Sequence, residues 1–197
     1  DTPIEETMEA LDTLVKSGKV RALGASSMYG YQFHNMQEVA KNNNWTLFSV
    51  MQNHYNLLYR EDEHEMIPIC QQYAVSLVPY SPLAGGHLTH RGWDSDSLRA
   101  KTDKVRRDKY DHAIDNDTIM IDRVSELAEK YNVSMAQISL SWLLKRGVAS
   151  PIVGATSIPH FEDAVKAVEL ELSDEDCRYL EEDYKPHSIV GLLPNTK

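Results

Sequence analysis

The sequence predicts an α/β fold in which a parallel sheet is covered by helices. Short apolar stretches that suit buried strands alternate with segments whose apolar residues recur at helical spacing. This alternation of strand and helix continues along most of the 197 residues. Because parallel strands must be joined by a crossover, which is usually a helix, the order favours a parallel sheet.

The first eighty residues contain three predicted helices and three predicted strands. Apolar residues recur at helical spacing from Ile4 to Val15, and Gly18 ends that helix. Pro68 should kink a later helix or lie near its first turns. The elements that follow the first helix are a strand at 20–25, a helix at 31–43, a strand at 47–52, a helix at 61–73 and a strand at 75–80.

The chain opens directly on a helix start. Thr2 can cap the helix, Pro3 suits its first position and Glu5 completes a capping box. Because the sequence begins at Asp1 rather than at an initiator methionine, we expect it to have been cut from a longer protein.

The second half continues the pattern after an interruption. Residues 86–118 are rich in charge and poor in apolar residues, and we expect a mobile loop there, with a lid over a ligand site as the alternative. Ser134 and Gln137 form a capping box that opens another helix. A fourth strand is predicted at 151–154, and helices at 159–169 and at 174–183, the latter capped by Ser173. No linker is evident, so residues 1–197 should form a single domain.

The stretch VSLVPYSPLAGG, residues 75–86, is the strongest functional signal. A buried strand ends at Tyr80, and small residues with free backbone N–H groups follow. Ligands of parallel α/β folds bind at the carboxyl ends of strands. An aromatic ring followed by such a turn suits a flat heterocycle with an attached phosphate, although a buried strand with an ordinary surface turn is the simpler alternative.

Composition excludes several classes of protein. A net charge of −10 disfavours nonspecific binding to nucleic acid or to an anionic membrane. Cys70 and Cys177 do not make a disulfide framework, so a reducing, cytoplasmic location is expected. No segment approaches the length of a membrane span.

Five motifs in order resemble the aldo-keto reductases, specifically the aryl-alcohol dehydrogenase-like branch. They are TPIEETMEALDTLVKSGKVRALGASSMYG, SVMQNHYNLLYRE, VPYSPLAGGHLT, SPIVGATS and YLEEDYKPHSIVG. Periodicity alone leaves an open sheet and a closed barrel both possible. The resemblance implies a (βα)₈ barrel that uses NADPH, without a metal, to reduce aldehydes and ketones. It further implies that this chain is the C-terminal half of that barrel, with four parallel strands and their helices.

The resemblance also implies a cofactor-binding role for particular positions. Ser26, Ser27 and Gln52 match contacts to the nicotinamide carboxamide, and Tyr80 matches the residue that stacks on the nicotinamide ring. Ser81, Leu83 and Gly85 match the loop along the pyrophosphate. The site for the adenosine 2′-phosphate is matched by residues at and after a helix start, namely Gly154, Ala155, Thr156, Ser157, His160 and Asp163.

Two departures from the family pattern affect the expected cofactor. Many relatives carry Arg where this chain has His160, and Asn where it has Ala164. Histidine is a weaker and pH-dependent partner for a phosphate than arginine. NADPH is therefore the expected cofactor, and NAD(H) remains the alternative.

The family's catalytic Asp, Tyr, Lys and His belong to the first four strands, whose match positions are not in this sequence. In the family a Tyr protonates the carbonyl oxygen while hydride reaches the carbon. We therefore expect a chain that positions the hydride donor of an oxidoreductase but lacks the acid–base residues. The alternatives are a nucleotide-binding or regulatory partner module, as the potassium-channel β subunits are, or a truncated gene product that does not work alone.

Other residues that could suggest chemistry are expected to be structural. Tyr55, Tyr59 and Tyr184 are expected to pack or to lie at the surface, because a proton donor needs a partner that lowers its pKa. Cys70 should be a reduced core cysteine. Loop or surface positions are expected for the histidines, which lack further zinc ligands: His54, His64, His87 and His90.

If the chain is half of a barrel, it should self-associate, be molten or be insoluble. Two strand edges, at 20–25 and 151–154, and apolar side chains from the barrel interior would be exposed, and such edges and patches pair with other chains. Light scattering after size exclusion and near-ultraviolet circular dichroism on the purified chain measure this. A well-packed 22.4 kDa monomer with a sharp melt would contradict the half-barrel interpretation.

Overall fold

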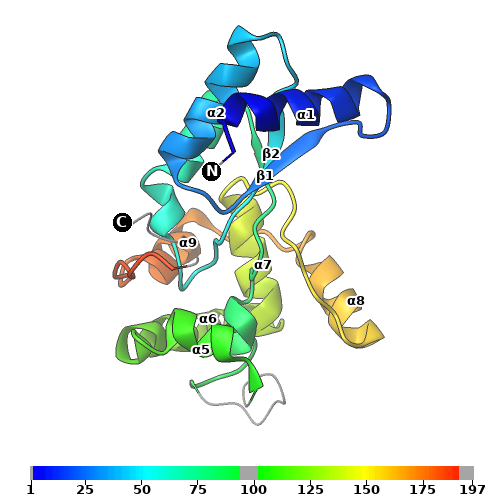
Figure 1. The fold of residues 1–197 in the computed structure, drawn as a ribbon. Helices are drawn as coiled ribbons and strands as arrows, with labels where there is room; N and C mark the ends of the chain where they lie inside the picture. The colour runs from blue at the N-terminus through cyan, green and yellow to red at the C-terminus, as the bar shows by residue number, and fades with distance from the viewer. Residues whose placement is uncertain (1, 94–101, 191–197) are drawn as a thin grey trace. The chain divides into compact units, whose positions relative to one another are not determined.

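The computed structural model describes residues 2–93 and 102–190, which form two compact units. The first unit comprises residues 2–53 and 62–78, and the second comprises residues 54–61, 79–93 and 102–190. Figure 1 shows the helices and strands of both units as a ribbon. No helix in the described residues is both long enough and apolar enough to cross a membrane.

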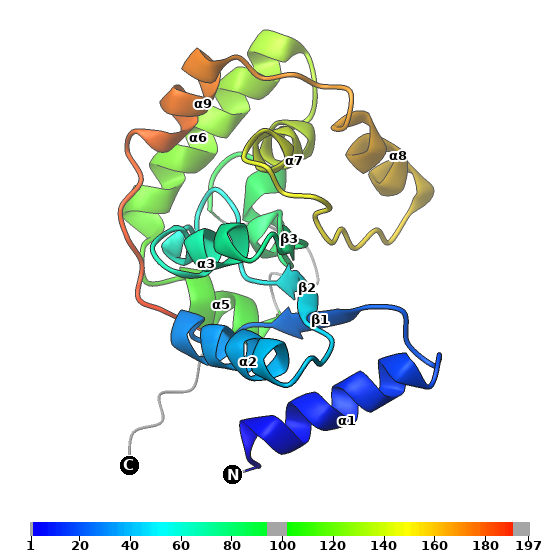
Figure 2. The same ribbon diagram turned by 90° about the horizontal axis from the view of Figure 1, so that it is seen from above.

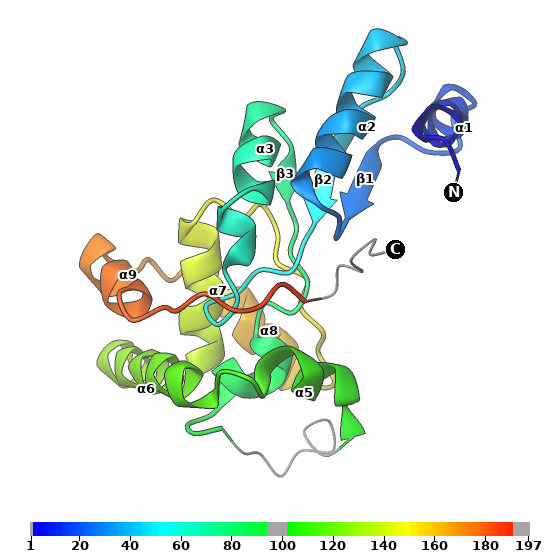
Figure 3. The same cartoon turned by 60° about the vertical axis from the view of Figure 1, so that its left-hand side comes forward.

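The first unit is a parallel sheet with helices packed beside it, as the alternation predicts. Its three strands are arranged in the order β1-β2-β3, and both neighbouring pairs are parallel. Figure 3 shows α2 and α3 running beside these strands. The elements of this unit are α1 (Ile4–Lys16), β1 (Leu23–Ser26), α2 (Gly30–Asn42), β2 (Phe48–Gln52), α3 (Met66–Gln72) and β3 (Ser76–Leu77).

The core of the first unit comes from the apolar faces that the sequence predicts. Met8, Phe33, Ala40 and Met51 are fully buried. The buried side chain of Gln37 on α2 bonds both the N–H and the carbonyl oxygen of Phe48, at 2.9 and 3.0 Å. This amide ties α2 to the start of β2 by satisfying two backbone groups that burial would otherwise leave unpaired.

The second unit is mainly helical. Its helix α9 lies alongside α6 (Figure 2), and α7 packs against both α6 and α8. Trp142, Leu143 and Ile138 on α7 are fully buried and form much of its core. Its helices are η2 (Ala84–Thr89), α5 (Lys104–Tyr110), α6 (Ile114–Tyr131), α7 (Met135–Lys145), α8 (Ile158–Lys166) and α9 (Asp174–Glu181), and a short 3₁₀ turn, η1 (Glu61–Glu63), lies at its boundary.

The region predicted as a charged loop contains regular structure. Residues 84–89, 104–110 and the start of α6 are helical, while Arg99 and Lys101 lie outside the described residues. The 18-residue α6 is absent from the sequence prediction, although Met120, Val124 and Leu127 lie on one helical face and are buried. The many Asp and Glu residues of α6 obscured that periodicity.

The fourth predicted strand, at 151–154, is not formed as a strand in the described residues. One backbone hydrogen bond, from the N–H of Ile152 to the carbonyl oxygen of Pro79 at 2.9 Å, joins this segment to residues after β3. Pro151 cannot donate a backbone hydrogen bond, and Ile152 is 42% exposed. A single bond does not make a ladder, so the prediction of four strands is wrong for this structure.

The predicted helix ends are partly confirmed. Ser134 and Ser173 cap α7 and α9, accepting hydrogen bonds from the N–H groups of Gln137 and Asp176. Pro68 lies in the first turn of α3. The predicted cap at Thr2 is wrong, because Pro3 occupies the N-cap position of α1 and no side chain caps that helix. The extended ψ of Pro3, 143°, excludes it from the first helical position.

Helix α8 carries an apolar stripe that solvent reaches. Ile158, Phe161 and Val165 recur at helical spacing on α8 and are 74%, 61% and 52% exposed, and Val168, two residues after the helix, is 72% exposed. No residue of α8 is buried. The apolar face of this helix is therefore not part of the core of the second unit.

Replacing Asp176 with alanine should destabilise the packing of α9 on α6. Its carboxylate accepts hydrogen bonds from Lys130 and Tyr131 at 2.6 Å and from Ser173 at 2.7 Å. We expect the free energy of unfolding, measured in urea, to fall by about 2–3 kcal/mol. Asp174→Ala is the matched control, because that side chain is 85% exposed and should have a much smaller effect.

The same pair of variants has a pH signature. Burial opposes ionisation of Asp176, but the bonds from Lys130, Tyr131 and Ser173 outweigh it and hold the pKa below its usual 3.8. The carboxylate therefore stabilises the fold above that pH, and the stabilisation is lost as the pH falls through the lowered pKa. A destabilisation by Asp176→Ala that stays constant from pH 6 to pH 3 would contradict this assignment.

Candidate functional site

The carboxyl ends of β1 and β2 bring together three of the predicted residues. Ser26 and Gln52 are register partners, and the Ser26 hydroxyl donates to the Gln52 carbonyl oxygen at 3.0 Å. The N–H of Ser27 donates to the same oxygen at 3.3 Å. Ser27 adopts a left-handed φ of 29°, which turns the chain sharply away from the strand. The side chains of Ser26 and Gln52 are exposed.

In the second unit, the loop after β3 holds Tyr80, Ser81, Leu83 and Gly85. Its backbone makes two tight turns, from Ala84 N–H to the Ser81 carbonyl oxygen at 3.0 Å and from Gly86 N–H to the Leu83 carbonyl oxygen at 2.8 Å. Ser81 has a φ of 53°, and Gly85 has a φ of 64°. Residues other than glycine rarely adopt this conformation, and strained backbone of this kind clusters at functional sites when no helix end requires it.

Asn56 holds this loop in place. Its buried Nδ2 donates to the Ser81 carbonyl oxygen and to the Tyr110 hydroxyl, both at 2.9 Å. Its Oδ1 accepts from the N–H groups of Leu58 and Tyr59 at 2.9 and 3.0 Å. Every donor and acceptor of the amide is therefore used, which is what a fully buried asparagine requires.

His54 lies between two parallel aromatic rings. Its ring centroid is 4.1 Å from that of Tyr59 and 5.2 Å from that of Tyr80, with interplanar angles of 17° and 9°. His54 also forms a single parallel bridge with Tyr80. The stack sets the plane of the Tyr80 ring.

The His54 side chain is neutral. Burial lowers its pKa from the usual 6.5 to about 3, and the charges of Lys109 and His187 act in the same direction. Nε2 lies 2.8 Å from the Tyr110 hydroxyl, which also accepts a hydrogen bond from Asn56. This contact joins His54 to the buried Asn56 network.

Two of the four histidines expected in loops or at the surface are in fact core residues. His54 is 3% exposed and His87 is fully buried, and His87 stacks on Trp93 at 3.9 Å. The expectation was wrong because aromatic rings cover each imidazole: a nearby ring stacks on it, Tyr59 on His54 and Trp93 on His87, and the more distant Tyr110 contacts both edge-on. In the described residues, no cluster of three or more His, Cys, Asp or Glu side chains could hold a metal ion.

The residues predicted to bind the adenosine phosphate lie at the start of α8. Gly154, Ala155, Thr156 and Ser157 are exposed, and the Ser157 side chain makes no capping hydrogen bond with the first turn. The ring of His160 is exposed, with Nδ1 3.5 Å from the Thr156 hydroxyl.

Asp163 has a structural contact that the sequence does not indicate. Its carboxylate accepts a hydrogen bond from the Ser134 hydroxyl at 2.6 Å and another from the Gln137 side chain. Asp163 thereby joins α8 to the first turn of α7.

The remaining candidates are structural. Tyr55 and Tyr59 are buried, and burial together with the Glu61 hydrogen bond raises the pKa of Tyr184. Burial, with a smaller effect of Asp62, raises the pKa of the Cys70 thiol to about 12, so its reactive thiolate form is disfavoured. Sequence reasoning missed Asn56, Tyr110 and Lys109, since no motif marks a buried network or a lysine that lies against a tyrosine.

The fold and these residues define an α/β protein whose candidate ligand contacts lie at the ends of parallel strands and in the loops that follow, as in many α/β enzymes. The sequence profile of the Aldo/keto reductase family matches residues 1–185. The chain therefore belongs to the aldo/keto reductase family.

Relatives with assigned names agree with this family. An aldo-keto reductase of Fusarium vanettenii is 47% identical over 190 residues, covering 96% of this chain and 51% of the relative. Versiconal hemiacetal acetate reductase of Aspergillus parasiticus is 44% identical over 197 residues, covering 96% and 55%. A Schizosaccharomyces pombe protein provisionally named aryl-alcohol dehydrogenase is 48% identical over 192 residues, covering 95% and 53%. The chain thus spans about half the length of these relatives.

Replacing Asn56 with alanine should destabilise the second unit by about 2–4 kcal/mol, because the Leu58 N–H loses its acceptor and the Ser81 carbonyl oxygen, the Tyr59 N–H and the Tyr110 hydroxyl each lose one buried hydrogen bond. The measurement is the free energy of unfolding. Asn43→Ala is the control, since Asn43 is exposed and bonds only locally, to Val39 at 2.9 Å. Equal effects of the two substitutions would show that the network does not hold the loop.

His54→Phe should abolish a pH dependence of stability. The unfolded chain binds a proton near pH 6.5 that folded His54 does not bind until about pH 3. Stability should therefore fall on acidification through this range, by up to ~1.4 kcal/mol per pH unit. Unfolding at pH 7, 6, 5 and 4 measures the slope for each protein. His112→Phe, at an exposed position, is the control, and an identical slope in wild type and His54→Phe would refute the assignment.

Proposed function

We propose that this chain provides the cofactor-binding half of an NADP-dependent oxidoreductase that reduces aldehydes or ketones to alcohols. Its family membership and reductase-named relatives support the reaction class. The single observation that carries the cofactor assignment is the loop after β3, where a half-buried Tyr80 precedes consecutive left-handed residues. In the complete protein, the other half of the barrel and the acid–base residues would be supplied by chain outside these 197 residues.

The residues at the ends of β1 and β2 fit a carboxamide. Such a group carries two N–H donors and one carbonyl acceptor. The Ser26 hydroxyl already donates its proton to the Gln52 carbonyl oxygen, so its oxygen is left to accept a hydrogen bond from the carboxamide nitrogen. The exposed side-chain amide of Gln52 can donate to the carboxamide oxygen.

The residues of the second unit fit the ring and the phosphates. Tyr80 offers an aromatic surface whose plane His54 sets, and the following loop offers backbone N–H groups. At α8, the N–H groups of the first turn have no side-chain cap and can donate to a phosphate. The weaker charge of His160, where an arginine would bind more firmly, keeps NAD(H) as the alternative cofactor.

A bound NADPH supplies a hydride for transfer to a carbonyl carbon. This chain's part is to bind and orient it: Ser26, Ser27 and Gln52 fix the rotation of the carboxamide, and Tyr80 supports the ring. No proton transfer to the substrate is assigned to this chain. Burial and the hydrogen bond to Glu61 raise the pKa of Tyr184, and the buried His54 is neutral, so neither side chain is a ready proton donor.

The test measures turnover by the 197-residue chain, and NADPH binding by that chain completed with its N-terminal half. We expect the completed chain to bind NADPH in calorimetry. We expect the 197-residue chain to show no NADPH oxidation with an aromatic aldehyde above the rate without protein, since lost proton transfer alone costs about 10²–10⁴-fold. Tyr80→Ala should weaken NADPH binding about threefold to tenfold, because stacking contributes roughly 0.5–1.5 kcal/mol beyond buried area. Tyr31→Ala, at a 55% exposed tyrosine, is the control.

Three outcomes decide among the possibilities. NADPH binding by the completed chain that depends on Tyr80, together with no turnover by the 197-residue chain, supports the proposal. Turnover by the pure chain would contradict the assignment of the acid–base residues to chain outside it. Affinity for NADPH that Tyr80→Ala leaves unchanged would mean that the assignment of the loop after β3 is wrong.

A further inference from the structure

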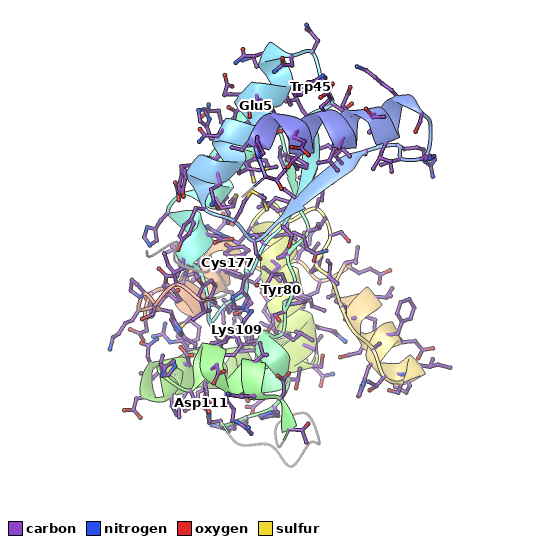
Figure 4. All side chains as sticks on the ribbon, viewed as in Figure 1. Glu5, Trp45, Tyr80, Lys109, Asp111 and Cys177 are labelled. Carbon is purple, nitrogen blue, oxygen red and sulfur yellow. The ribbon has the colours of Figure 1, made fainter. Side chains whose placement is uncertain are left out.

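Lys109 on α5 lies against Tyr80. Its ammonium group donates to the Tyr80 hydroxyl at 3.2 Å and lies 4.6 Å from the centroid of the tyrosine ring. Figure 4 labels the two side chains, one on α5 and the other in the loop after β3. The contact brings a positive charge to the residue that the proposed function assigns to the nicotinamide ring.

The position of Lys109 is anchored by its neighbour. Tyr110 is 1% exposed, and its hydroxyl bonds to Asn56 at 2.9 Å and to His54 at 2.8 Å. The same asparagine holds the Ser81 carbonyl oxygen. The helix that carries Lys109 and the loop that carries Tyr80 are therefore joined by one buried hydrogen-bond network. This network holds the two side chains close to one another.

The charge of Lys109 is not neutralised within the described part of the chain. Its ammonium forms no ion pair there, although the protein has a net charge of −10 and Asp108 and Asp111 flank it on α5. Those two aspartates are exposed. A lysine paired with an aromatic ring keeps its charge, and that charge acts on any group that stacks on the ring.

The two redox forms of a nicotinamide differ in charge, because the oxidised ring is cationic and the reduced ring is neutral. Stacked rings have centroids about 4.5–7 Å apart, so a nicotinamide on Tyr80 would lie roughly 6 Å from the Lys109 ammonium. At that distance, and with an effective dielectric constant between half that of water and that of water, charge repulsion weakens binding of the oxidised form about threefold to tenfold. The phosphates are common to both forms and cancel in the comparison.

We propose that Lys109 makes this site discriminate against the oxidised cofactor and so favours binding of the reduced dinucleotide. The inference rests on the proposed function, because it requires the nicotinamide ring to stack on Tyr80. It adds to that function a residue that selects the redox state of the cofactor by its charge. Such selection favours the exchange of oxidised cofactor for reduced cofactor.

The experiment uses the chain completed with its N-terminal half. It measures the dissociation constants for NADPH and for NADP⁺ by calorimetry and compares their ratio among variants. Lys109→Met removes the charge and keeps the length of the side chain, while Lys109→Arg keeps the charge. Lys104→Met is the matched control, because it removes one charge from an exposed position of the same helix. We expect Lys109→Met to lower the ratio of the NADP⁺ dissociation constant to the NADPH dissociation constant about threefold to tenfold. The other two variants should preserve this ratio.

The outcomes separate this inference from the proposed function. A wild-type ratio that falls towards the Lys109→Met value at 0.5 M salt supports a charge effect. If both forms bind, and Tyr80→Ala weakens both while Lys109→Met leaves the ratio unchanged, the inference is wrong and the proposed function stands. If the wild-type chain binds neither form, the cofactor assignment fails and the role of Lys109 fails with it.

Discussion

The buried side-chain amide of Asn56 is the interaction on which the region after β3 depends. One residue closes the turn at 56–59, holds the backbone of Ser81 and positions the Tyr110 hydroxyl. Since all of its hydrogen-bonding groups are satisfied out of water, the network is rigid and costly to rearrange. The ring plane of Tyr80 and the approach of Lys109 both follow from it.

Backbone strain separates structural turns from the candidate site. Six residues other than glycine have a left-handed φ in the described chain. Three directly follow helices, where this conformation commonly ends the helix: Asn44, Ala74 and Asn132. The other three lie after β1 or after β3, where no helix end requires it: Ser27, Ser81 and Ala84. Strain that persists without such a requirement is typical of ligand-binding loops.

The helices and strands were largely predictable where one physical rule applied. The face from Ile4 to Val15 predicts α1, and Ser134 and Ser173 predict the starts of α7 and α9, because helical spacing and side-chain caps are local. Prediction failed for α6, whose apolar stripe is diluted by acidic residues, and at 151–154, where strand formation depends on a partner rather than on composition.

The sequence by itself determined the α/β class, the family and the segments that carry the candidate cofactor contacts, since motifs and periodicity are properties of neighbouring residues. Tertiary structure alone decided that His54 is a buried neutral base between two rings and that Asp163 joins two helices. It also brought Lys109 to Tyr80 across 29 positions of the chain. Such pairings arise from packing between distant segments, and burial and electrostatics follow from that packing rather than from any local pattern.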